Sequence, residues 1–486
     1  MKKFIYTAFL SIALLVAVVF LKALSFTSIQ IEPEPMPRLH LDTQQAAINL
    51  SRAIRIKTIS SRDSATFEPA GFKAFHLFLE KTFPQAHRHL RKEVIGGYSL
   101  LYTWKGSEDH LKPILLMAHM DVVPVAPGSE GGWSYPPFAG QIAEHFIWGR
   151  GSLDDKGSLL AIMEAVETLL ADGFQPRRTF YLAFGHDEEV GGFEGAAKIA
   201  ALLGERNVRV GWILDEGGFI SMGILPGVSR PVALIGIAEK GYLTLALSVK
   251  QEGGHSSMPP PQSAIGILSS AIHHLERNPF PAKLDGATMQ LFEFVGPEMP
   301  FGMKLIFANT WLFSPLIKKQ FKEISSINAL IRTTLAPTII RAGNKENVLP
   351  QLATAKVNFR LYPGDSIDYV IDHVKRSIDD SRVQIKAAND DFNEASSISE
   401  VNSEGFKLLE RSVRQVFTDT IVAPFLLVAG TDTKHYTGIC DDIFRFYPMR
   451  LTSKDLSRIH GTNERIGNDN YGEIIKFYIQ MIRNSN

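Results

Sequence analysis

The sequence predicts an α/β fold that is interrupted by a smaller α+β unit and preceded by an apolar helix. From about residue 40, short apolar runs alternate with amphipathic stretches, as strands and helices do in an α/β domain. Near residue 240 the pattern changes to a clear polar/apolar alternation, and after about residue 390 the first pattern returns. We therefore expect a discontinuous main domain of residues 41–238 and 390–486, with a domain of residues 239–389 inserted in it.

The N-terminal segment has the features of a membrane-directed helix. Lys2 and Lys3 precede Phe4–Leu21, which contains no charged residue, proline or glycine. We expect residues 1–25 to be an uncleaved signal anchor, and Ala23-Leu24-Ser25 would be the cleavage site if they were instead a signal peptide. The positive-inside rule then places the body on the non-cytoplasmic side of a membrane, whereas cleavage would make it secreted or periplasmic. The polar, proline-rich residues 26–40 are expected to be a linker.

The composition is that of a globular protein and gives no sign of a nucleic-acid-binding or a disulfide-stabilised one. The chain has 486 residues, 45% of them hydrophobic, which is enough for a sizeable core. Lys+Arg and Asp+Glu both number 51, so no basic surplus indicates nucleic acid as a partner. The single cysteine, Cys440, has no partner in the chain for a disulfide.

The main domain is predicted from three short apolar runs and one long amphipathic segment. Pro113–Ala118, Thr179–Phe184 and Val210–Leu214 are expected to be strands of a sheet covered on both faces. Ser158–Leu170 has apolar residues at three- and four-residue spacing and is expected to be a helix.

The inserted domain is predicted to be a small antiparallel sheet with helices on one face, as in ferredoxin-like folds. Its expected strands and helices, in chain order, are Tyr242–Val249, Gln262–Leu275, Thr354–Leu361, Ser366–Ile378 and Val383–Ala387. The aromatic segment Phe292–Leu316 interrupts this order. It is typical of core, and the alternatives are a wall of an apolar pocket or a contact with a membrane.

Ionisable residues follow each predicted strand of the main domain. The first strand runs into His119, the second into the stretch HDEEVGG with Glu188 and Glu189, and the third into Asp215. Strand ends in an open α/β sheet line one crevice, where such folds bind ligands. Asp154 and Asp155 precede the long helix, and His460 precedes a helix near the C-terminus.

Each of these residues also has an ordinary structural explanation: a helix N-cap for the aspartate pair, a core histidine for His119 and a turn for Asp215. Together they would place many carboxylates in one crevice, which is costly unless a counter-charge is present. Divalent cations bound through carboxylate oxygens and imidazole nitrogens would supply that charge.

The five motifs HMDVVP, GRGSLDDKG, HDEEVGG, LDEGG and IHGTNERI, in this order, resemble the co-catalytic zinc aminoacylase/carboxypeptidase family, which includes carboxypeptidase G, carnosinase and succinyl-diaminopimelate desuccinylase. The resemblance covers roughly residues 45–480. The long aromatic excursion is most similar to the branch of carboxypeptidase S and N-fatty-acyl-amino-acid synthase/hydrolase. The fold that the resemblance implies is a zinc-peptidase catalytic domain with a ferredoxin-like lid and dimerisation domain.

The resemblance also implies a metal site. His119 and Asp215 would bind one zinc, Glu189 and His460 the other, and Asp154 would bridge the two ions, with Co²⁺ or Mn²⁺ as alternatives to Zn²⁺.

Around these ligands the resemblance implies three further features. Asp121 would orient the His119 ring, Glu188 would be the general base, and the Asp154–Asp155 peptide bond would be cis.

The implied reaction is hydrolysis of the amide bond of N-acyl amino acids or short peptides with a free C-terminal carboxylate. His255 in GGHSSMPP would stabilise the oxyanion, and in several relatives this histidine comes from the lid of a second subunit. Arg360 in NFRLYPG would hold the substrate carboxylate, and Asn347, Gly430 and Thr431 would contact substrate nearby.

Three alternatives remain at this point. A dipeptidase or small-acyl deacylase of the same family would use the same residues. A two-metal phosphoesterase would need cationic or glycine-rich phosphate contacts, and the sequence contains no Walker-type loop. A non-catalytic scaffold should have lost a ligand or the base, and all of these positions are occupied by suitable residues.

Overall fold

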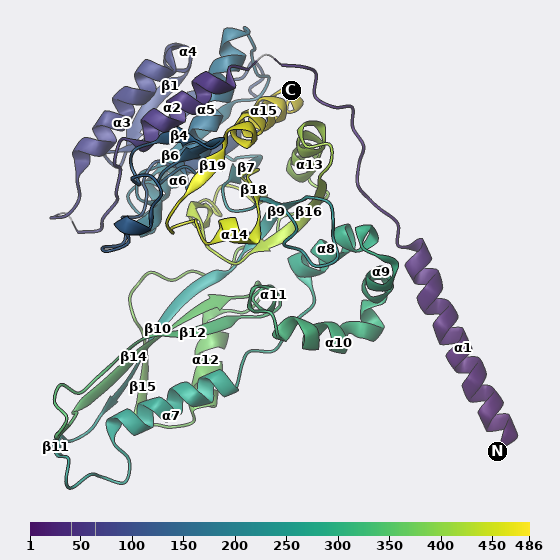
Figure 1. Ribbon diagram of the computed structural model, residues 1–486, viewed down its shortest axis with the longest axis vertical. Coiled ribbons are helices and arrows are strands. Elements are labelled where there is room, and N and C mark those ends of the chain that lie inside the picture. The colour runs from purple at the N-terminus through teal and green to yellow at the C-terminus, as the bar shows by residue number, and fades with distance from the viewer. Residues whose placement is uncertain (40, 64) are drawn as a thin grey trace.

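The computed structural model of the protein describes residues 1–39, 41–63 and 65–486. Figure 1 shows a main sheet covered by helices, a second sheet at the lower left, and the helix α1 (Lys2–Ser25) that projects from the body. The predicted α/β class with an N-terminal apolar helix is thereby confirmed. His40, the last residue of the predicted linker, lies outside the described residues.

The main sheet is mixed and has the strand order β1-β2-β6-β3-β7-β17-β9-β8-β18, with β16 paired to β9. Its central strands β6, β3 and β7 are parallel, so their carboxyl ends share one edge. The strands are β1 (Arg91–Ile95), β2 (Ser99–Trp104), β3 (Ile114–His119), β6 (Phe180–Gly185), β7 (Trp212–Asp215), β8 (Ile220–Ser221), β9 (Val232–Glu239), β16 (Ile421–Leu427), β17 (Ile443–Arg445) and β18 (Arg450–Leu451).

Helices cover both faces of this sheet because its strands are apolar on both sides. In β3, Leu116 belongs to the core on one face and Leu115 to the core on the other. The first core is closed by helices that include α5 and α15, and the second by α6. The helices of the main body are α2 (Thr43–Ile54), α3 (Pro69–Thr82), α4 (Pro84–His89), α5 (Lys156–Ala171), α6 (Ala196–Glu205), α13 (Glu404–Val416), α14 (Ser453–Leu456) and α15 (Asn468–Asn484). The strands and the helix predicted for the main domain match β3, β6, β7 and α5.

A small antiparallel sheet joins two segments that lie far apart in the chain. β19 (Arg465–Gly467) pairs with β5 (Phe146–Trp148), which pairs with β4 (Gln141–Ala143). The loop before β19 and the loop after β5 therefore lie side by side, which brings His460 towards Asp154.

The second sheet has the strand order β12-β14-β10-β15, and its core is formed with α7 and α12 on one face. Its elements are β10 (Gly241–Lys250), α7 (Ala264–Arg277), β12 (Thr334–Ala342), β14 (Leu352–Leu361), α12 (Ile367–Ile378) and β15 (Val383–Ala387). The ribbon β11 (Gly254–His255) with β13 (Val348–Leu349) forms its far tip (Figure 1). With β12, which is not among the strands predicted from the sequence, the element order is strand–helix–strand–strand–helix–strand, as expected for a ferredoxin-like fold.

The aromatic excursion folds as helices between α7 and β12. They are α8 (Gly286–Val295), α9 (Phe301–Ala308), α10 (Thr310–Lys322) and the short α11 (Ser325–Asn328). α8 contributes Leu291 and Val295 to the core of the main sheet, although its sequence lies inside the expected insertion. α9 and α10 lie on the outside of the body next to α1 (Figure 1).

α1 is 24 residues long and strongly apolar, and it is exposed along most of its length, with Val19 and Ala23 buried. By length and composition it is capable of crossing a membrane. The segment that follows is held along the body rather than standing free as a stalk. The side-chain amide of Gln30 donates to the Val422 carbonyl and accepts from the Val422 N–H, and the Met36 N–H donates to the Gln415 carbonyl.

A half-buried acid between two helices of the main core makes stability depend on pH. Asn49 of α2 donates a hydrogen bond to Glu164 of α5 at 2.8 Å, and burial raises the Glu164 pKa from 4.5 to about 7 despite this bond. Because the folded-state pKa exceeds the unfolded-state value, the stability that this group contributes is complete below the unfolded pKa and is lost as the pH rises towards 7.

We expect Glu164→Gln to raise the melting temperature by about 1–3 °C at pH 8 and by less at pH 5, because the amide keeps the Asn49 bond without a buried charge. Melting curves at both pH values measure this difference. The exposed Glu205→Gln on α6 serves as the control and should change neither value. An equal gain at both pH values for Glu164→Gln would contradict the explanation.

Candidate metal centre

The carboxyl ends of three parallel strands bring acids and a histidine to one edge of the main sheet. His119 is the last residue of β3, and Asp215 is the last residue of β7, followed directly by Glu216. After β6 the chain turns into a short 3-10 helix, η2 (Glu188–Val190), which carries Glu188 and Glu189. This is the crevice that the sequence pattern predicts.

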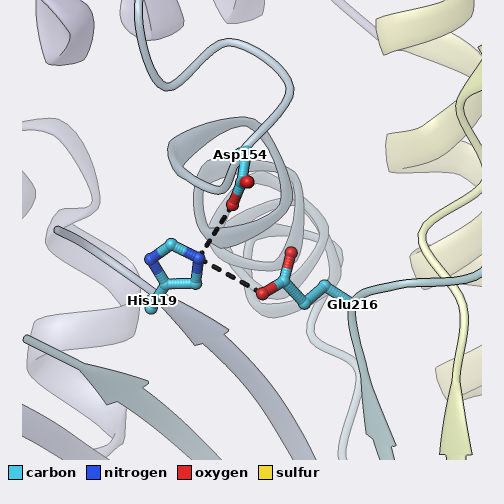
Figure 2. Close-up of side chains that lie close together, drawn as sticks. All are labelled: His119, Asp154 and Glu216. Carbon is cyan, nitrogen blue, oxygen red and sulfur yellow. Dashed lines mark hydrogen bonds and ion pairs between the residues drawn. The ribbon is translucent and has the colours of Figure 1, made fainter. Parts of the chain in front are cut away.

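A first group of possible metal ligands consists of His119, Asp154 and Glu216 (Figure 2). His119 Nε2 lies 2.9 Å from Asp154 Oδ1 and 3.2 Å from Glu216 Oε1. Burial alone would lower the pKa of His119, but the carboxylates of Glu216, Asp121 and Asp154 raise it well above its ordinary value. The ring therefore faces strongly negative surroundings.

A second group consists of Asp154, Glu189 and His460. His460 Nε2 lies 2.9 Å from Asp154 Oδ2 and 3.2 Å from Glu189 Oε2. Hydrogen bonds with Asp154 and Glu189 raise the pKa of His460 to about 10. Asp154 thus belongs to both groups and offers one oxygen to each, which is the arrangement expected of a bridging ligand.

The structure brings Glu216, and not the expected Asp215, to the His119 ring. Asp215 is still within β7 and lies opposite Arg445 of β17 in the parallel register. Its Oδ2 is buried and has no hydrogen-bond partner in the part of the chain that the structure describes. Burial raises the Asp215 pKa to about 6. Successive side chains of an extended segment point to opposite sides, so only one member of an Asp-Glu pair faces the group. The sequence motif does not indicate which one.

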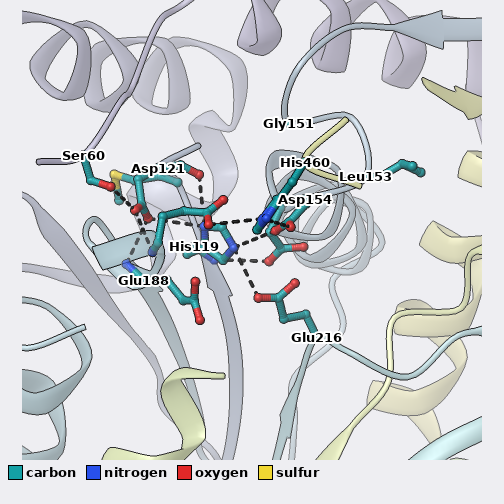
Figure 3. A network of polar contacts seen from close by, with 12 residues as sticks. Ser60, His119, Asp121, Gly151, Leu153, Asp154, Glu188, Glu216 and His460 are labelled. Carbon is teal, nitrogen blue, oxygen red and sulfur yellow. Dashed lines mark hydrogen bonds and ion pairs between the residues drawn. The ribbon is translucent and has the colours of Figure 1, made fainter. Parts of the chain in front are cut away.

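Asp121 links the first group to the turn that carries Glu188 (Figure 3). Its carboxylate lies 3.3 Å from His119 Nδ1 and accepts the backbone N–H groups of Glu188 at 3.2 Å and Glu189 at 3.1 Å. Ser60 donates a further hydrogen bond to it at 2.6 Å. One buried carboxylate therefore contacts both the histidine ring and the segment with the expected base.

Glu188 lies beside the two groups but belongs to neither. Burial raises its pKa well above 4.5, and the neighbouring carboxylates of Asp432, Glu216 and Glu189 add to this effect. Asp432 is packed so closely against the turn that a Cβ at Gly192 would lie 1.9 Å from its carboxylate. The glycine of the HDEEVGG motif therefore makes room for this packing.

Arg150 and Glu464 form a buried pair that has no assignment from the sequence, although each lies within a quoted motif. Arg150 donates to Glu464 at 2.6 Å and to the His460 carbonyl at 3.1 Å. The other Glu464 oxygen accepts the N–H groups of Gly151, Leu153 and Asp154 at 2.8, 2.9 and 3.3 Å. The pair fixes the loop of Asp154 against the loop of His460.

Two backbone features accompany these loops. The peptide bond between Asp154 and Asp155 is cis, as the resemblance implies. Asp155 is the N-cap residue of α5, but its side chain makes no capping bond and instead accepts the His119 N–H at 3.2 Å. His460 has φ of 59°, an uncommon conformation for a residue other than glycine and one that clusters at functional sites.

A cavity of about 310 Å³ opens onto both groups. Its lining includes the ionisable residues Asp154, Glu188 and His460 together with several apolar residues. The apolar lining residues are Leu153, Leu427, Ala429, Met449 and Ile459.

The expected substrate contacts lie at different distances from this cavity. Gly430 and Thr431 line it, and the Arg360 guanidinium, stacked on the Tyr242 ring at 4.8 Å, lies beside Gly430. The Thr431 N–H donates to the buried Glu239, so this backbone donor already has a partner. Arg360 is thus placed near the cavity from the second sheet.

His255 and Asn347 are not brought to the cavity by their own chain. Both are exposed at the β11–β13 tip, where the Ser256 N–H donates to the Asn347 carbonyl at 3.1 Å. Figure 1 places this tip at the end of the second sheet that points away from the main sheet.

Comparison with known proteins gives a family model and several relatives that match most of the chain. The family model described as peptidase family M20/M25/M40 matches residues 115–484. A probable carboxypeptidase S-like protein of Dictyostelium discoideum is 44% identical, over 96% of this chain and 91% of its own. An N-fatty-acyl-amino acid synthase/hydrolase of Xenopus tropicalis is 41% identical, over 91% of this chain and 86% of its own.

Among solved structures, an M20 family metallo-carboxypeptidase from Sulfolobus solfataricus aligns with a TM-score of 0.64 and 19% identity, over 91% of this chain and 99% of that one. This likeness shows the shared fold. The family resemblance carried by the five motifs is confirmed, and the match extends over most of the chain. The protein is a hydrolase and belongs to peptidase family M20/M25/M40.

Proposed function

We propose that the protein is a two-metal amidohydrolase that cleaves N-acyl amino acids or short peptides with a free C-terminal carboxylate. The observation that carries the proposal is the pair of donor groups that share Asp154. The family match supports hydrolysis, and the names of the relatives supply the substrate class as a hypothesis for this chain.

The donor set fits divalent metal ions. Each group combines an imidazole nitrogen with carboxylate oxygens, which are the ligands that zinc prefers together with sulfur. A Glu189 oxygen is also buried without a hydrogen-bond partner among the described residues, as expected for an atom that serves a cation. We propose His119, Glu216 and Asp154 for one Zn²⁺, and Asp154, Glu189 and His460 for the other, with Co²⁺ or Mn²⁺ as substitutes. Bound metal ions would supply an acidified water and polarise the scissile carbonyl.

Glu188 is proposed as the general base. Its carboxyl lines the cavity next to both groups, and the hydrogen bonds from its backbone and that of Glu189 to Asp121 hold the turn in place. Glu188 would accept a proton from the attacking water and pass it to the leaving nitrogen. Asp121 would act on the reaction indirectly, by orienting the His119 ring.

The cavity and its surroundings have features suited to both parts of such a substrate, the acyl group and the carboxylate. The apolar wall formed by Leu427, Met449 and Ile459 would receive the acyl chain. Arg360 would hold the carboxylate with its planar guanidinium, beside Gly430 and Thr431.

Residues 239–389 are proposed as a lid and dimerisation domain. Because His255 and Asn347 lie at its exposed tip, we propose that they reach the metal centre of a second subunit rather than their own. His255 would then donate a hydrogen bond to the oxyanion that forms at the scissile carbonyl.

The proposed location of the protein rests on α1. Lys2 and Lys3 precede a helix capable of spanning a membrane, so we propose an anchor with the hydrolase body on the non-cytoplasmic side.

Replacement of the base tests the mechanism. We expect Glu188→Gln to lower the turnover of N-acyl amino acids by about 10²–10⁴-fold, with unchanged metal content, because the amide cannot accept a proton. Mass spectrometry of a panel of N-acyl amino acids and dipeptides, with metal analysis of each variant, measures both quantities. The panel also separates the proposed function from a dipeptidase or a small-acyl deacylase.

The matched control is Glu194→Gln, which removes an exposed carboxylate a few residues away that pairs with Lys198. It should leave turnover unchanged. Full turnover in Glu188→Gln with both metals present would remove Glu188 from the mechanism, and zero turnover of every amide by the wild-type holoenzyme would contradict the proposed function.

A mixture of two inactive variants tests the second-subunit role of His255. We expect His255→Ala and Glu188→Gln to be inactive separately and to recover about one quarter of wild-type activity when co-expressed, since half the dimers would be mixed and each would hold one complete site. Activity of the separated dimer species measures this recovery. A mixture no more active than its components would show that His255 does not act across subunits.

A further inference from the structure

α9 and α10 present an exposed apolar surface beside α1. Trp311 is 54% exposed and Leu316 is 45% exposed, and Phe301 and Leu312 are exposed next to them. Trp311, Leu312, Pro315 and Leu316 recur at the spacing of one helix face. We call the α9–α10 segment with this face the platform.

The platform is in direct contact with the C-terminal part of α1. The Asn309 side chain, fully buried between α9 and α10, donates to the Val19 carbonyl at 2.9 Å. The Phe301 ring packs on Phe20 with a centroid separation of 5.9 Å, and Lys22 lies over the Trp311 ring at 5.4 Å. Ala23 is fully buried, whereas the N-terminal part of α1 is exposed. α1 is thus fixed to the platform by its last turns.

This contact determines where the platform lies relative to a bilayer. The apolar stretch of α1 ends at Leu21, followed by Lys22. Val19 lies only three residues before Lys22, which is about 5 Å along a helix. Side chains that contact Val19 and Phe20 must therefore lie at the level where the span meets the headgroup layer.

The charges of the platform fit such a layer. Lys318, Lys319 and Lys322 follow the apolar face within α10, and Lys304 lies in α9. Tryptophan beside lysines, with leucines on the same helix, is the composition of helices that lie in the interface of an anionic membrane. Each lysine near such a surface adds a modest attraction, and several together add up.

The platform is joined to the body by a separate set of aromatic side chains on its inner face. Phe307 stacks on Phe292 of α8 with a centroid separation of 4.6 Å, and Phe321 lies 5.4 Å from the same ring. These inner aromatic side chains join the platform to α8, which packs in the main core. The outer aromatic side chains, Phe301 and Trp311, contact α1 instead and remain about half exposed.

We propose that the platform is a membrane-contact surface that lies in the headgroup layer of an anionic bilayer beside α1. It fixes the orientation of the hydrolase body on the membrane, in addition to the tether that α1 provides. The proposal requires α1 to span the membrane, but it does not depend on the reaction that the metal centre catalyses.

The test is depth-resolved quenching of a label on the platform. The full chain carrying Leu312→Cys is labelled with a fluorescent maleimide and reconstituted in phosphatidylcholine–phosphatidylglycerol vesicles with nitroxide lipids. Cys440 is buried, so the introduced thiol is the accessible one. We expect lipid nitroxides to quench this label at least about threefold more than the same label at Leu77→Cys.

Leu77 is the control because it is also an exposed leucine, 55% against 36% for Leu312, and lies on α3 at the opposite side of the body from α1 (Figure 1). Melting curves of both labelled chains show that they are folded. Replacement of Lys318, Lys319 and Lys322 by glutamate should reduce the quenching in these anionic vesicles.

Three results would overturn the proposal. Equal quenching at Leu312 and Leu77 would place the platform away from lipid. Cross-linking of Leu312→Cys between two chains without quenching would make the surface an interface with a second copy. Intact-mass measurement of a mature membrane-free chain that has lost α1 would remove the span on which the placement depends.

Discussion

The arrangement of the site depends on one constraint: many carboxylates are buried close together around Asp154, and their negative charge must be compensated. Asp154 lies between two imidazole rings, and burial would raise its pKa, but the hydrogen bonds from His119 and His460 hold that pKa below its usual value. Burial raises the pKa values of Asp155, Asp215, Glu188, Glu189 and Glu216, and repulsion from neighbouring carboxylates adds to this effect. So many acids in a poorly solvated crevice are tolerable only with a counter-charge. Divalent ions are the counter-charge that the donor set fits, and the parallel strands, the cis loop and the Arg150–Glu464 pair all serve to hold that donor set together.

The sequence predicts most of the residues in this crevice, but not how each of them is oriented. Motifs at strand ends predict the crevice and its residues because parallel strands end at a common edge. They do not distinguish Asp215 from Glu216, because neighbouring residues differ only in the side to which the backbone turns them. The sequence does not identify Glu464 as a positioning residue, because its partners are mainly backbone N–H groups more than 300 residues away in the chain. The sequence of the aromatic segment Phe292–Leu316 is compatible with core, with a pocket wall and with a membrane contact. In the structure, inner side chains such as Phe307 pack against α8, whereas outer ones such as Trp311 are exposed.

Two long-range arrangements connect the metal centre to its surroundings. The second sheet brings Arg360 beside the cavity but carries His255 and Asn347 away to its tip, so one chain holds an incomplete set of the expected substrate contacts. A symmetric dimer would complete both sites at once.

The N-terminal segment forms the second arrangement. Residues 26–39 follow the main body, with Gln30 bonded to β16, and join it to α1, which is bonded to Asn309. The apolar helix is therefore packed against the folded body through its last turns.

Anomalous diffraction from crystals of the zinc-loaded protein tests the central claim most directly. The account predicts two peaks about 3.5–4 Å apart on either side of the Asp154 carboxylate. One peak should be ligated by His119 and Glu216 and the other by Glu189 and His460. A single peak, or two peaks that do not share Asp154, would contradict the two-metal account. A peak ligated by Asp215 in place of Glu216 would contradict the assignment of Glu216 as a ligand.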